Sequence, residues 1–262
     1  MISPFDSAAD GYDATFEDHP VTRDLREVVR QTLADNFRSG ARVLELNCGT
    51  GTDAVSLAER GVRVTAIDSS REMIARARAK IDRHRLGEMV TCRELDVDML
   101  WTIDDEQFDG AFSNFGGLNC TPRLAEVAES VSRILKPGAA LIVCLLNRTC
   151  LWEMAAFIAR GNPVRALRRF RRGGTDAPVG TAVQRVWYYS PGETARLLSP
   201  WFEVEETYGL SILSPAPNSR RFTSSHPGMT DSLLRLDGRL RRVYPFRSLG
   251  DHFVVVARRV SG

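Results

Sequence analysis

The chain has 262 residues, of which 43% are hydrophobic and 26% are charged, and its formal net charge is +2. This length and apolar content are sufficient for one large domain, or for one domain with a smaller addition. So small a charge does not by itself predict binding to nucleic acid or to an anionic membrane.

The cysteines, the histidines and the N-terminus narrow the class of protein further. The five cysteines are odd in number and form no CxxC pair, which favours free thiols over a disulfide framework. The four histidines lack metal-ligand spacing, so we expect no metal site. The acidic N-terminus lacks the apolar core of a signal peptide, and no apolar run is long enough to span a membrane. These features predict a cytoplasmic protein.

The chain begins with an irregular lead that is followed by a helix. Apolar residues recur near helical spacing over residues 19–37, beginning with Val21 and Leu25. Ser39 and Gly40 end this helix. We expect residues 1–40 to form an N-terminal lid and this first helix.

Residues 41–147 alternate regularly between apolar and amphipathic segments. The apolar segments predict strands at residues 41–47, 62–68, 89–97, 108–116 and 139–147. The amphipathic segments predict helices at residues 52–61, 69–87 and 121–135. The second of these helices opens with a serine cap and closes at Gly87. Strands that are apolar throughout are covered on both faces, so the pattern predicts an α/β fold with a Rossmann-like, doubly wound sheet.

After residue 147 the alternation breaks. Residues 148–182 carry many arginines against one acid, Glu153, before Asp176, and this stretch ends in a loop. Strands are expected at residues 182–190, 201–213 and 251–260, helices at 191–200 and 229–246, and a loop at 214–228. The prediction is that residues 183–213 and 251–262 complete the core sheet begun in 41–147. Residues 148–182 and 214–250 are then insertions that cap the substrate.

The stretch VLELNCGTGTD at residues 43–53 carries the strongest functional signal. A strand ends there on the carboxylate of Glu45, and Gly49 and Gly51 permit a tight turn with a ligand against the backbone. In an open parallel sheet, ligands bind beyond the carboxyl ends of the strands. The GxGxxG fingerprint of dinucleotide enzymes is incomplete, and Asp53 would repel a phosphate at the start of the next helix. Glu45 suits instead a cationic ligand that carries an amine.

This stretch resembles the first motif of the class I S-adenosylmethionine-dependent methyltransferases, and further motifs follow in the family's order. VTAID ends on Asp68, which matches the acid that binds the ribose hydroxyls, and CRELDV contains Asp96, which matches the acid near the adenine amino group. FDGAFSNFGGLN is similar to the strand whose end borders the methyl group, and DHFVVVARR resembles the antiparallel last strand. The resemblance implies S-adenosylmethionine as cofactor, S-adenosylhomocysteine as product, and a mostly parallel sheet.

The same resemblance implies a set of cofactor-binding residues. They are Tyr12, Glu45, Asn47, Gly49, Gly51, Asp68, Ser69, Met73, Asp96, Val97 and Asn114. Asn47 stands where the family has its first glycine, and because asparagine tolerates left-handed backbone, we expect the loop to keep its shape. The lead FDSAADGYDATFEDHP resembles a lid that closes over the cofactor and brings Tyr12 to its methionine end.

Two histidines are candidates for catalysis. A general base is needed only where the methyl acceptor is protonated at the working pH. His19 is the nearest candidate in the sequence, and His226, in the stretch SSHPG, has a similar claim. The arginines of residues 160–172 fit a solvated helix face, an entrance for an acidic substrate, or a contact with RNA phosphates.

The leading hypothesis is methyl transfer to an oxygen, nitrogen or carbon atom of a small molecule, as in natural product biosynthesis. An RNA or protein methyltransferase and a non-catalytic cofactor-binding homologue are the alternatives. The small charge and the stretch SNFGG, which replaces the N/D-P-P-Y/F motif after the fourth strand, argue against RNA and protein acceptors. No membrane partner is expected, and the sequence does not predict the oligomeric state.

Overall fold

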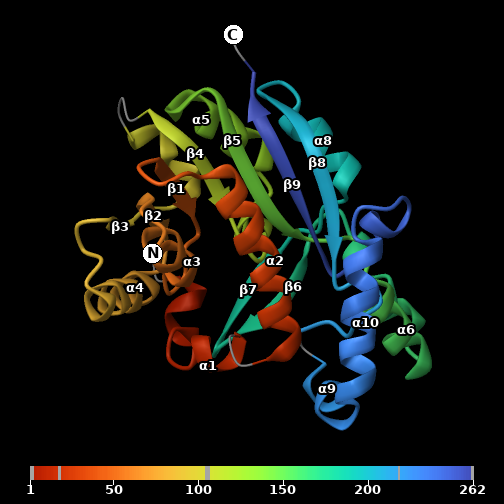
Figure 1. The fold of residues 1–262 in the computed structure, drawn as a ribbon. Helices are drawn as coiled ribbons and strands as arrows, with labels where there is room; N and C mark the ends of the chain where they lie inside the picture. The colour runs from red at the N-terminus through yellow and green to blue at the C-terminus, as the bar shows by residue number, and fades with distance from the viewer. Residues whose placement is uncertain (1–2, 17–18, 104–106, 218, 261–262) are drawn as a thin grey trace.

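The computed structural model describes residues 3–16, 19–103, 107–217 and 219–260. Its centre is a seven-stranded sheet with the order β3-β2-β1-β4-β5-β9-β8 (Figure 1). The strands are β1 (Arg42–Leu46), β2 (Arg63–Asp68), β3 (Val90–Glu94), β4 (Phe108–Ser113), β5 (Leu135–Leu146), β8 (Phe202–Leu210) and β9 (His252–Arg259). β1 to β5 pair in parallel, whereas β9 runs antiparallel between β5 and β8. The Rossmann-like fold with its antiparallel last strand is confirmed.

Helices cover both faces of this sheet. One face carries α2 (Pro20–Asn36), α3 (Thr52–Ala58) and α4 (Arg71–His84), and the other carries α5 (Leu124–Ile134) and α8 (Pro191–Leu198). The helical spacing of Leu25, Val29 and Leu33 places these side chains of α2 in the first of the two cores. α2 lies across the front of the sheet in Figure 1. The sheet is thus buried on both sides, which explains why its strands are apolar along their whole length.

The strand order reverses between β1 and β4, and this point positions the site. Glu45 of β1 pairs with Ala66 of β2 on one side and with Phe112 of β4 on the other. The carboxyl ends of these strands lie at the edge of the sheet where the N-terminal segment packs (Figure 1). In doubly wound sheets, ligands bind at such a reversal.

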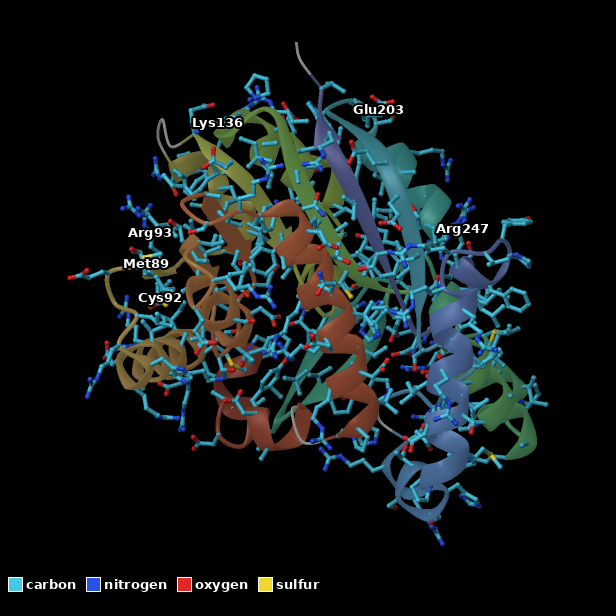
Figure 2. The ribbon with its side chains drawn as sticks, in the orientation of Figure 1. Met89, Cys92, Arg93, Lys136, Glu203 and Arg247 are labelled. Atoms are coloured by element: carbon cyan, nitrogen blue, oxygen red, sulfur yellow. The ribbon has the colours of Figure 1, made fainter. Side chains whose placement is uncertain are left out.

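Further elements lie around the carboxyl edge and the β8 side of the sheet. The N-terminal segment forms η1 (Pro4–Ala8) and α1 (Tyr12–Phe16), and η2 (Val97–Thr102) and η3 (Gly117–Cys120) follow β3 and β4. The insertions form α6 (Leu151–Ala159), α7 (Pro163–Ala166), η4 (Arg168–Phe170), α9 (Arg220–Ser225), α10 (Pro227–Leu240) and η5 (Phe246–Ser248). Figure 2 shows Lys136 and Glu203 at the far, amino end of β5 and β8, and Cys92 and Arg247 on opposite sides of the molecule.

One predicted strand belongs to a different sheet. Residues 183–186 were expected in the core sheet, but β7 (Ala182–Val186) pairs only with β6 (Thr175–Val179) in a separate hairpin. β6 was not predicted from the sequence, because it contains Asp176 and Pro178, and aspartate and proline are rare in strands. Pro178 is accommodated because the hairpin has no third strand that would need its missing N–H.

Two helix boundaries also differ from the prediction. Residues 214–228 were expected to be loop, but α9 forms within them because Phe222 packs edge-on against Trp152 with ring centroids 4.8 Å apart. α4 ends at His84 rather than near Gly87, since Arg85 adopts the left-handed conformation with φ 59°. The N–H of Leu86 then donates to the carbonyl of Ile81 and closes the helix end.

Over the described ranges, none of the helices combines the length and the apolar character that a membrane crossing requires.

Candidate functional site

A cavity of about 320 Å³ lies at the carboxyl ends of β1 and β4. Its walls come from the N-terminal segment, the glycine loop after β1, the start of α4, η2 and the turn after β4. Of the eleven predicted cofactor-binding residues, the lining contains ten: Tyr12, Glu45, Asn47, Gly49, Asp68, Ser69, Met73, Asp96, Val97 and Asn114. The fold therefore brings together residues that are up to about a hundred positions apart in the chain.

Glu45 is the most unusual side chain of this cavity. It is only 3% exposed, and one carboxylate oxygen, Oε2, has no hydrogen-bond partner among the described residues. The backbone N–H of Ala54 donates to this carboxylate. Burial, and then the nearby carboxylate of Asp53, raises the pKa of Glu45 well above its ordinary value. A buried oxygen without a donor is costly, so a ligand N–H placed here would be strongly bound.

The glycine loop keeps the shape that the resemblance implied. Asn47, Gly49 and Gly51 all adopt positive φ, at 55°, 53° and 75°. An added Cβ on Gly49 would meet nothing within 4 Å, so this residue leaves open space at the cavity wall. Asn47 therefore takes the left-handed conformation expected of a residue that replaces glycine.

Gly51 does not line the cavity and has a packing role instead. A Cβ on this residue would lie 2.9 Å from the Cβ of Ala77 on α4. The absence of a side chain thus lets α3 begin close against α4. Gly117 has a similar role after β4, because its Cβ would lie 2.4 Å from the Cβ of Asn47. The two loops that frame the cavity consequently touch.

Asp68 stabilises the loop as well as lining the cavity. Its Oδ2 accepts a hydrogen bond of 2.8 Å from the N–H of Gly49, and its Oδ1 accepts one of 2.9 Å from the N–H of Ser70. Burial raises the pKa of Asp68 against the effect of these two bonds. Ser70 caps α4 by accepting from the N–H of Met73 at 3.1 Å. A ligand hydroxyl at Asp68 would join a network that already fixes the loop.

Asp96 and Val97 form the wall that follows β3. Asp96 caps η2, where its Oδ1 accepts from the N–H of Asp98 at 2.9 Å. Val97 is buried beside it and presents an apolar surface to the cavity. An acid next to an apolar wall suits an aromatic ring that carries an amino group.

A chain of polar contacts closes the end of the cavity near β4. Asn114 donates to Asp53 Oδ2 at 2.8 Å, and Arg26 of α2 donates to Asp53 Oδ1 at 2.9 Å. Although burial opposes ionisation, Arg26 and then Arg30 hold the pKa of Asp53 below its ordinary value. The guanidinium of Arg26 also lies 4.9 Å from the ring centroid of Phe115. Asp53 is therefore neutralised by arginine.

Sequence reasoning missed Arg26, Phe115 and Gln184, all of which line the cavity. Arg26 is one of several arginines in its helix, and nothing in the spacing distinguishes it. Phe115 has a φ of 48°, which is rare for an aromatic residue and marks a constrained turn after β4. Gln184 belongs to β7, whose placement over the cavity depends on the unpredicted hairpin.

The N-terminal segment covers the cavity. Ser3, Pro4, Phe5 and Tyr12 line it, and Ser70 Oγ donates to Asp6 Oδ1 at 2.6 Å. Lys80 on α4 forms an ion pair of 2.8 Å with Asp13. Burial raises the pKa of Tyr12 to about 12, so this phenol stays protonated at neutral pH. These contacts attach the segment to α4.

Neither predicted catalytic histidine is among the lining residues. His19 precedes α2, is 6% exposed, and has a pKa lowered by burial and by nearby Arg220. His226 stacks on Phe222 with centroids 4.8 Å apart, between α9 and α10. Their catalytic role stays a prediction that the geometry does not support. Within the described residues, no cluster of histidine, cysteine, aspartate and glutamate could hold a metal ion.

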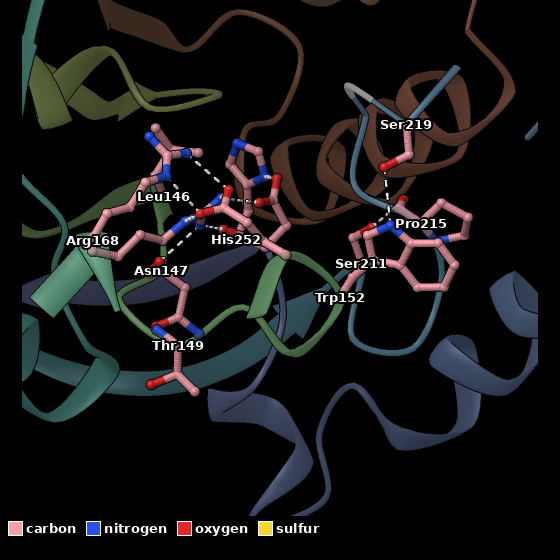
Figure 3. A network of polar contacts seen from close by, with 12 residues as sticks. Leu146, Asn147, Thr149, Trp152, Arg168, Ser211, Pro215, Ser219 and His252 are labelled. Carbon is pink, nitrogen blue, oxygen red and sulfur yellow. Dashed lines mark hydrogen bonds and ion pairs between the residues drawn. The ribbon is translucent and has the colours of Figure 1, made fainter. Parts of the chain in front are cut away.

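A second group of buried charges lies beyond β5, where β9 begins. The guanidinium of Arg169 is 2.8 Å from Glu153 Oε2 and 2.6 Å from Asp251 Oδ1. Asp251 also pairs with His252 at 3.0 Å. Although burial opposes ionisation, Arg169 and then His252 hold the pKa of Asp251 well below its ordinary value. Figure 3 shows Arg168, Asn147 and His252 gathered in this network.

Comparison with known proteins agrees with the geometry. The model of a methyltransferase domain family matches residues 43–138. A demethylmenaquinone methyltransferase of Clavibacter sepedonicus is 32% identical over 141 residues, which are 53% of this chain and 55% of that protein. A ubiquinone biosynthesis O-methyltransferase of Xylella fastidiosa (strain 9a5c) is 36% identical over 131 residues, or 49% and 51% of the two chains. The chain spans about half the length of these curated relatives.

Solved structures share the fold over nearly the whole chain. The [4+2]-cyclase SpnF superposes with a TM-score of 0.66 at 17% identity, over 98% of this chain and 94% of that one. The CcbJ methyltransferase from Streptomyces caelestis gives a TM-score of 0.62 at 19% identity, over 99% of both chains. These alignments show a common fold that extends over nearly the full length of the chain.

Proposed function

We propose that this chain, a member of the class I S-adenosylmethionine-dependent methyltransferases, transfers a methyl group from S-adenosylmethionine to a small-molecule acceptor. The observation that carries the proposal is a row of three acids, Glu45, Asp68 and Asp96, which line one cavity from the ends of neighbouring strands. This row matches a ligand with an amine at one end, hydroxyls in the middle and an aminated ring at the other.

The lining residues fit the cofactor chemically. Oε2 of Glu45 would accept from the ammonium of the methionine moiety, which supplies the donor that this buried oxygen lacks. Asp68 would accept from the ribose hydroxyls, and Asp96 would accept from the adenine amino group. Val97 and Met73 offer apolar surface for the base.

The chain contributes mainly orientation to the reaction. When bound, the cofactor supplies a methyl group that its positively charged sulfur activates. Asn114 is held in place because its amide donates to Asp53 and its Oδ1 accepts from the N–H of Phe115 at 2.9 Å. Phe5 and Tyr12 cover the cavity and exclude water. Orientation of two reactants accounts for about 7–11 kcal/mol of a barrier in favourable cases.

The titratable groups around the cavity favour an acceptor that needs no base. Burial raises the pKa of Tyr12 to about 12 and that of Cys120 to about 12, so both stay protonated at neutral pH. Neither predicted histidine contributes to the lining. We therefore propose an acceptor that is nucleophilic by itself at neutral pH, such as an aromatic amine or a readily ionised phenol or enol.

The acceptor class is proposed from the closure of the site and from the relatives. The lid from the N-terminus and Gln184 of the hairpin both border the cavity, which leaves room for a small molecule. The relatives are named for demethylmenaquinone, for ubiquinone biosynthesis and for phosphatidylethanolamine. A role in natural product biosynthesis and a cytoplasmic location are part of this proposal, and the five free cysteines are compatible with a reducing compartment.

Incubation with methyl-labelled S-adenosylmethionine and a metabolite extract tests the proposal, with total RNA and a protein extract in parallel. We expect label in a small organic product, and a product mass increased by one methylene. Label that enters only RNA or protein would overturn the acceptor class. Binding of S-adenosylhomocysteine without any labelled product would contradict methyl transfer and favour a homologue that binds the cofactor without transferring its methyl group.

A further inference from the structure

The arginine-rich insertion divides into two faces. Arg168 and Arg169 point inward: Arg168 donates to Glu153 at 2.8 Å, and the guanidinium of Arg169 pairs with both Glu153 and Asp251. These two residues attach η4 to the core. The other arginines of residues 160–172, here called the outer arginines, are exposed: Arg160, Arg165, Arg171 and Arg172.

Large apolar side chains are exposed on the same three elements. This outer apolar set consists of Ile158 (58% exposed), Val164 (73%), Leu167 (54%) and Phe170 (45%). α6, α7 and η4 therefore present four large hydrophobic residues among four cations within a segment of fifteen residues, 158–172. The sequence contains neither aspartate nor glutamate between residues 154 and 175.

This combination excludes two of the expected interpretations. A merely solvated face would not expose four large apolar side chains so close together, since such patches on soluble domains mark a binding site. RNA binding would use the arginines but would leave Ile158, Val164 and Leu167 without a counterpart, and Phe170 alone is not a stacking platform. A symmetric contact with a second copy would place arginine against arginine.

The surface of an anionic lipid bilayer matches both components. Apolar side chains of a surface helix bury at the boundary between headgroups and acyl chains, while arginines bind lipid phosphates. The formal net charge of +2 conceals this local excess of positive charge. Membrane binding of this kind is peripheral and needs no spanning helix.

We propose that the outer face of α6, α7 and η4 binds the surface of an anionic membrane. This inference goes beyond methyl transfer and stands on the outer arginines and the outer apolar set alone. One consequence does rest on the proposed function: an enzyme held at a bilayer meets acceptors that partition into lipid.

Co-sedimentation with vesicles tests the proposal without any methyl donor. We expect the full chain to bind vesicles of phosphatidylcholine and phosphatidylglycerol, and to bind pure phosphatidylcholine vesicles about tenfold less. Binding should weaken as salt is raised, because the phosphates are screened. Absence of binding, or equal binding to both kinds of vesicle, would overturn the proposal.

Matched variants locate the surface. Replacing the four outer arginines by glutamine should lower vesicle binding about tenfold or more, and Ile158→Ser with Phe170→Ser should lower it about fivefold. The control replaces four exposed arginines of the β2 side of the molecule by glutamine: Arg38, Arg60, Arg63 and Arg83. Both quadruple variants change the formal net charge from +2 to −2, so bulk charge is held constant between them.

Circular dichroism and binding of S-adenosylhomocysteine verify that each variant is folded. We expect the control to bind anionic vesicles within about twofold of the original chain. Equal losses in both quadruple variants would mean that bulk charge, not this surface, drives binding. Loss of a dimer in the serine variant, with vesicle binding unchanged, would show that a second copy covers the face and would contradict the proposal.

Discussion

Two buried carboxylate groups lie at the carboxyl edge of the same sheet and differ in how they are paired. Glu45, at the end of β1, has an oxygen without a partner among the described residues. Asp251, before β9, is held by Arg169 at 2.6 Å and by His252 at 3.0 Å. Burial alone therefore does not identify a functional acid.

This difference in pairing distinguishes a carboxylate that can bind a ligand from one that stabilises the fold. An unpaired buried carboxylate costs free energy in the unliganded chain and is retained where a ligand supplies the missing donor. A carboxylate that is paired with a buried arginine contributes to a rigid network, and removing the arginine leaves an uncompensated charge. We accordingly propose that Glu45 binds the cofactor and that Asp251 stabilises the fold.

The largest expected effect comes from breaking the paired group. Arg169→Met should lower the free energy of unfolding by about 3–5 kcal/mol, because it leaves the carboxylate of Asp251 buried without its arginine and removes one of the two arginines that pair with Glu153. Urea denaturation measures the loss. As a control, Arg185→Met breaks the exposed pair with Asp176 and should cost less than about 1 kcal/mol. Equal costs would show that burial of the pair has no consequence.

A smaller effect is expected at the glycine loop. Gly51→Ala should destabilise the chain by about 2–3 kcal/mol, because alanine is strained at φ 75° and its Cβ would lie 2.9 Å from that of Ala77. Gly138 also has φ 75° but has nothing within 4 Å of its Cβ position, so Gly138→Ala should cost only about 1 kcal/mol. Thermal unfolding of both variants separates the cost of the backbone strain, which they share, from the cost of the contact with Ala77, which only the Gly51 variant has. If Gly51→Ala lowers the stability no more than Gly138→Ala does, Gly51 is not needed for the close packing of α3 against α4.

Replacing the unpaired acid, Glu45, should stabilise the chain instead of destabilising it. Glu45→Gln should raise the free energy of unfolding without cofactor by about 1 kcal/mol, because a buried amide costs less than a buried carboxylate beside Asp53. Urea denaturation at neutral pH measures the gain. A loss of stability would mean that Glu45 supports the fold as Asp251 does.

The pH dependence of stability should differ in direction between the two groups. Folding raises the pKa of Glu45 above its ordinary value of 4.5. The stabilising contribution of Glu45 is therefore fully present below pH 4.5 and is lost as the pH rises through the folded pKa. The pKa of Asp251 is lowered from 3.8, so its contribution is present above that value and is lost as pH falls through the folded pKa. Unfolding followed from acid to neutral pH should show the advantage of Glu45→Gln growing with pH. The penalty of Asp251→Asn should shrink in acid, and parallel curves would contradict both assignments.

The sheet and the row of acids could be predicted from sequence because both are local. Each parallel strand is an apolar run that ends at a polar residue, and Asp68 and Asp96 follow their strands directly. Even the replacement of glycine by Asn47 gave a correct backbone prediction, since only the left-handed tolerance of asparagine was needed.

The remaining features depend on contacts between distant segments. Arg26 lines the cavity because α2 packs against the first turn of α3, where Arg26 pairs with Asp53. Nothing in the sequence of α2 indicates this contact. β6 contains residues that disfavour strands and forms only because β7 pairs with it. The arginines of residues 160–172 look alike in sequence, and their division into inward and outward faces required the positions of Glu153 and Asp251.

Calorimetric titration of S-adenosylhomocysteine into the original chain and into Glu45→Gln tests whether Glu45 binds the cofactor. We expect saturable binding by the original chain, and an affinity at least tenfold lower in the variant because a charge-assisted hydrogen bond is lost. Arg185→Met should bind as the original chain does. Equal affinities in the original chain and in Glu45→Gln would contradict the claim that the unpaired acid of β1 holds the cofactor.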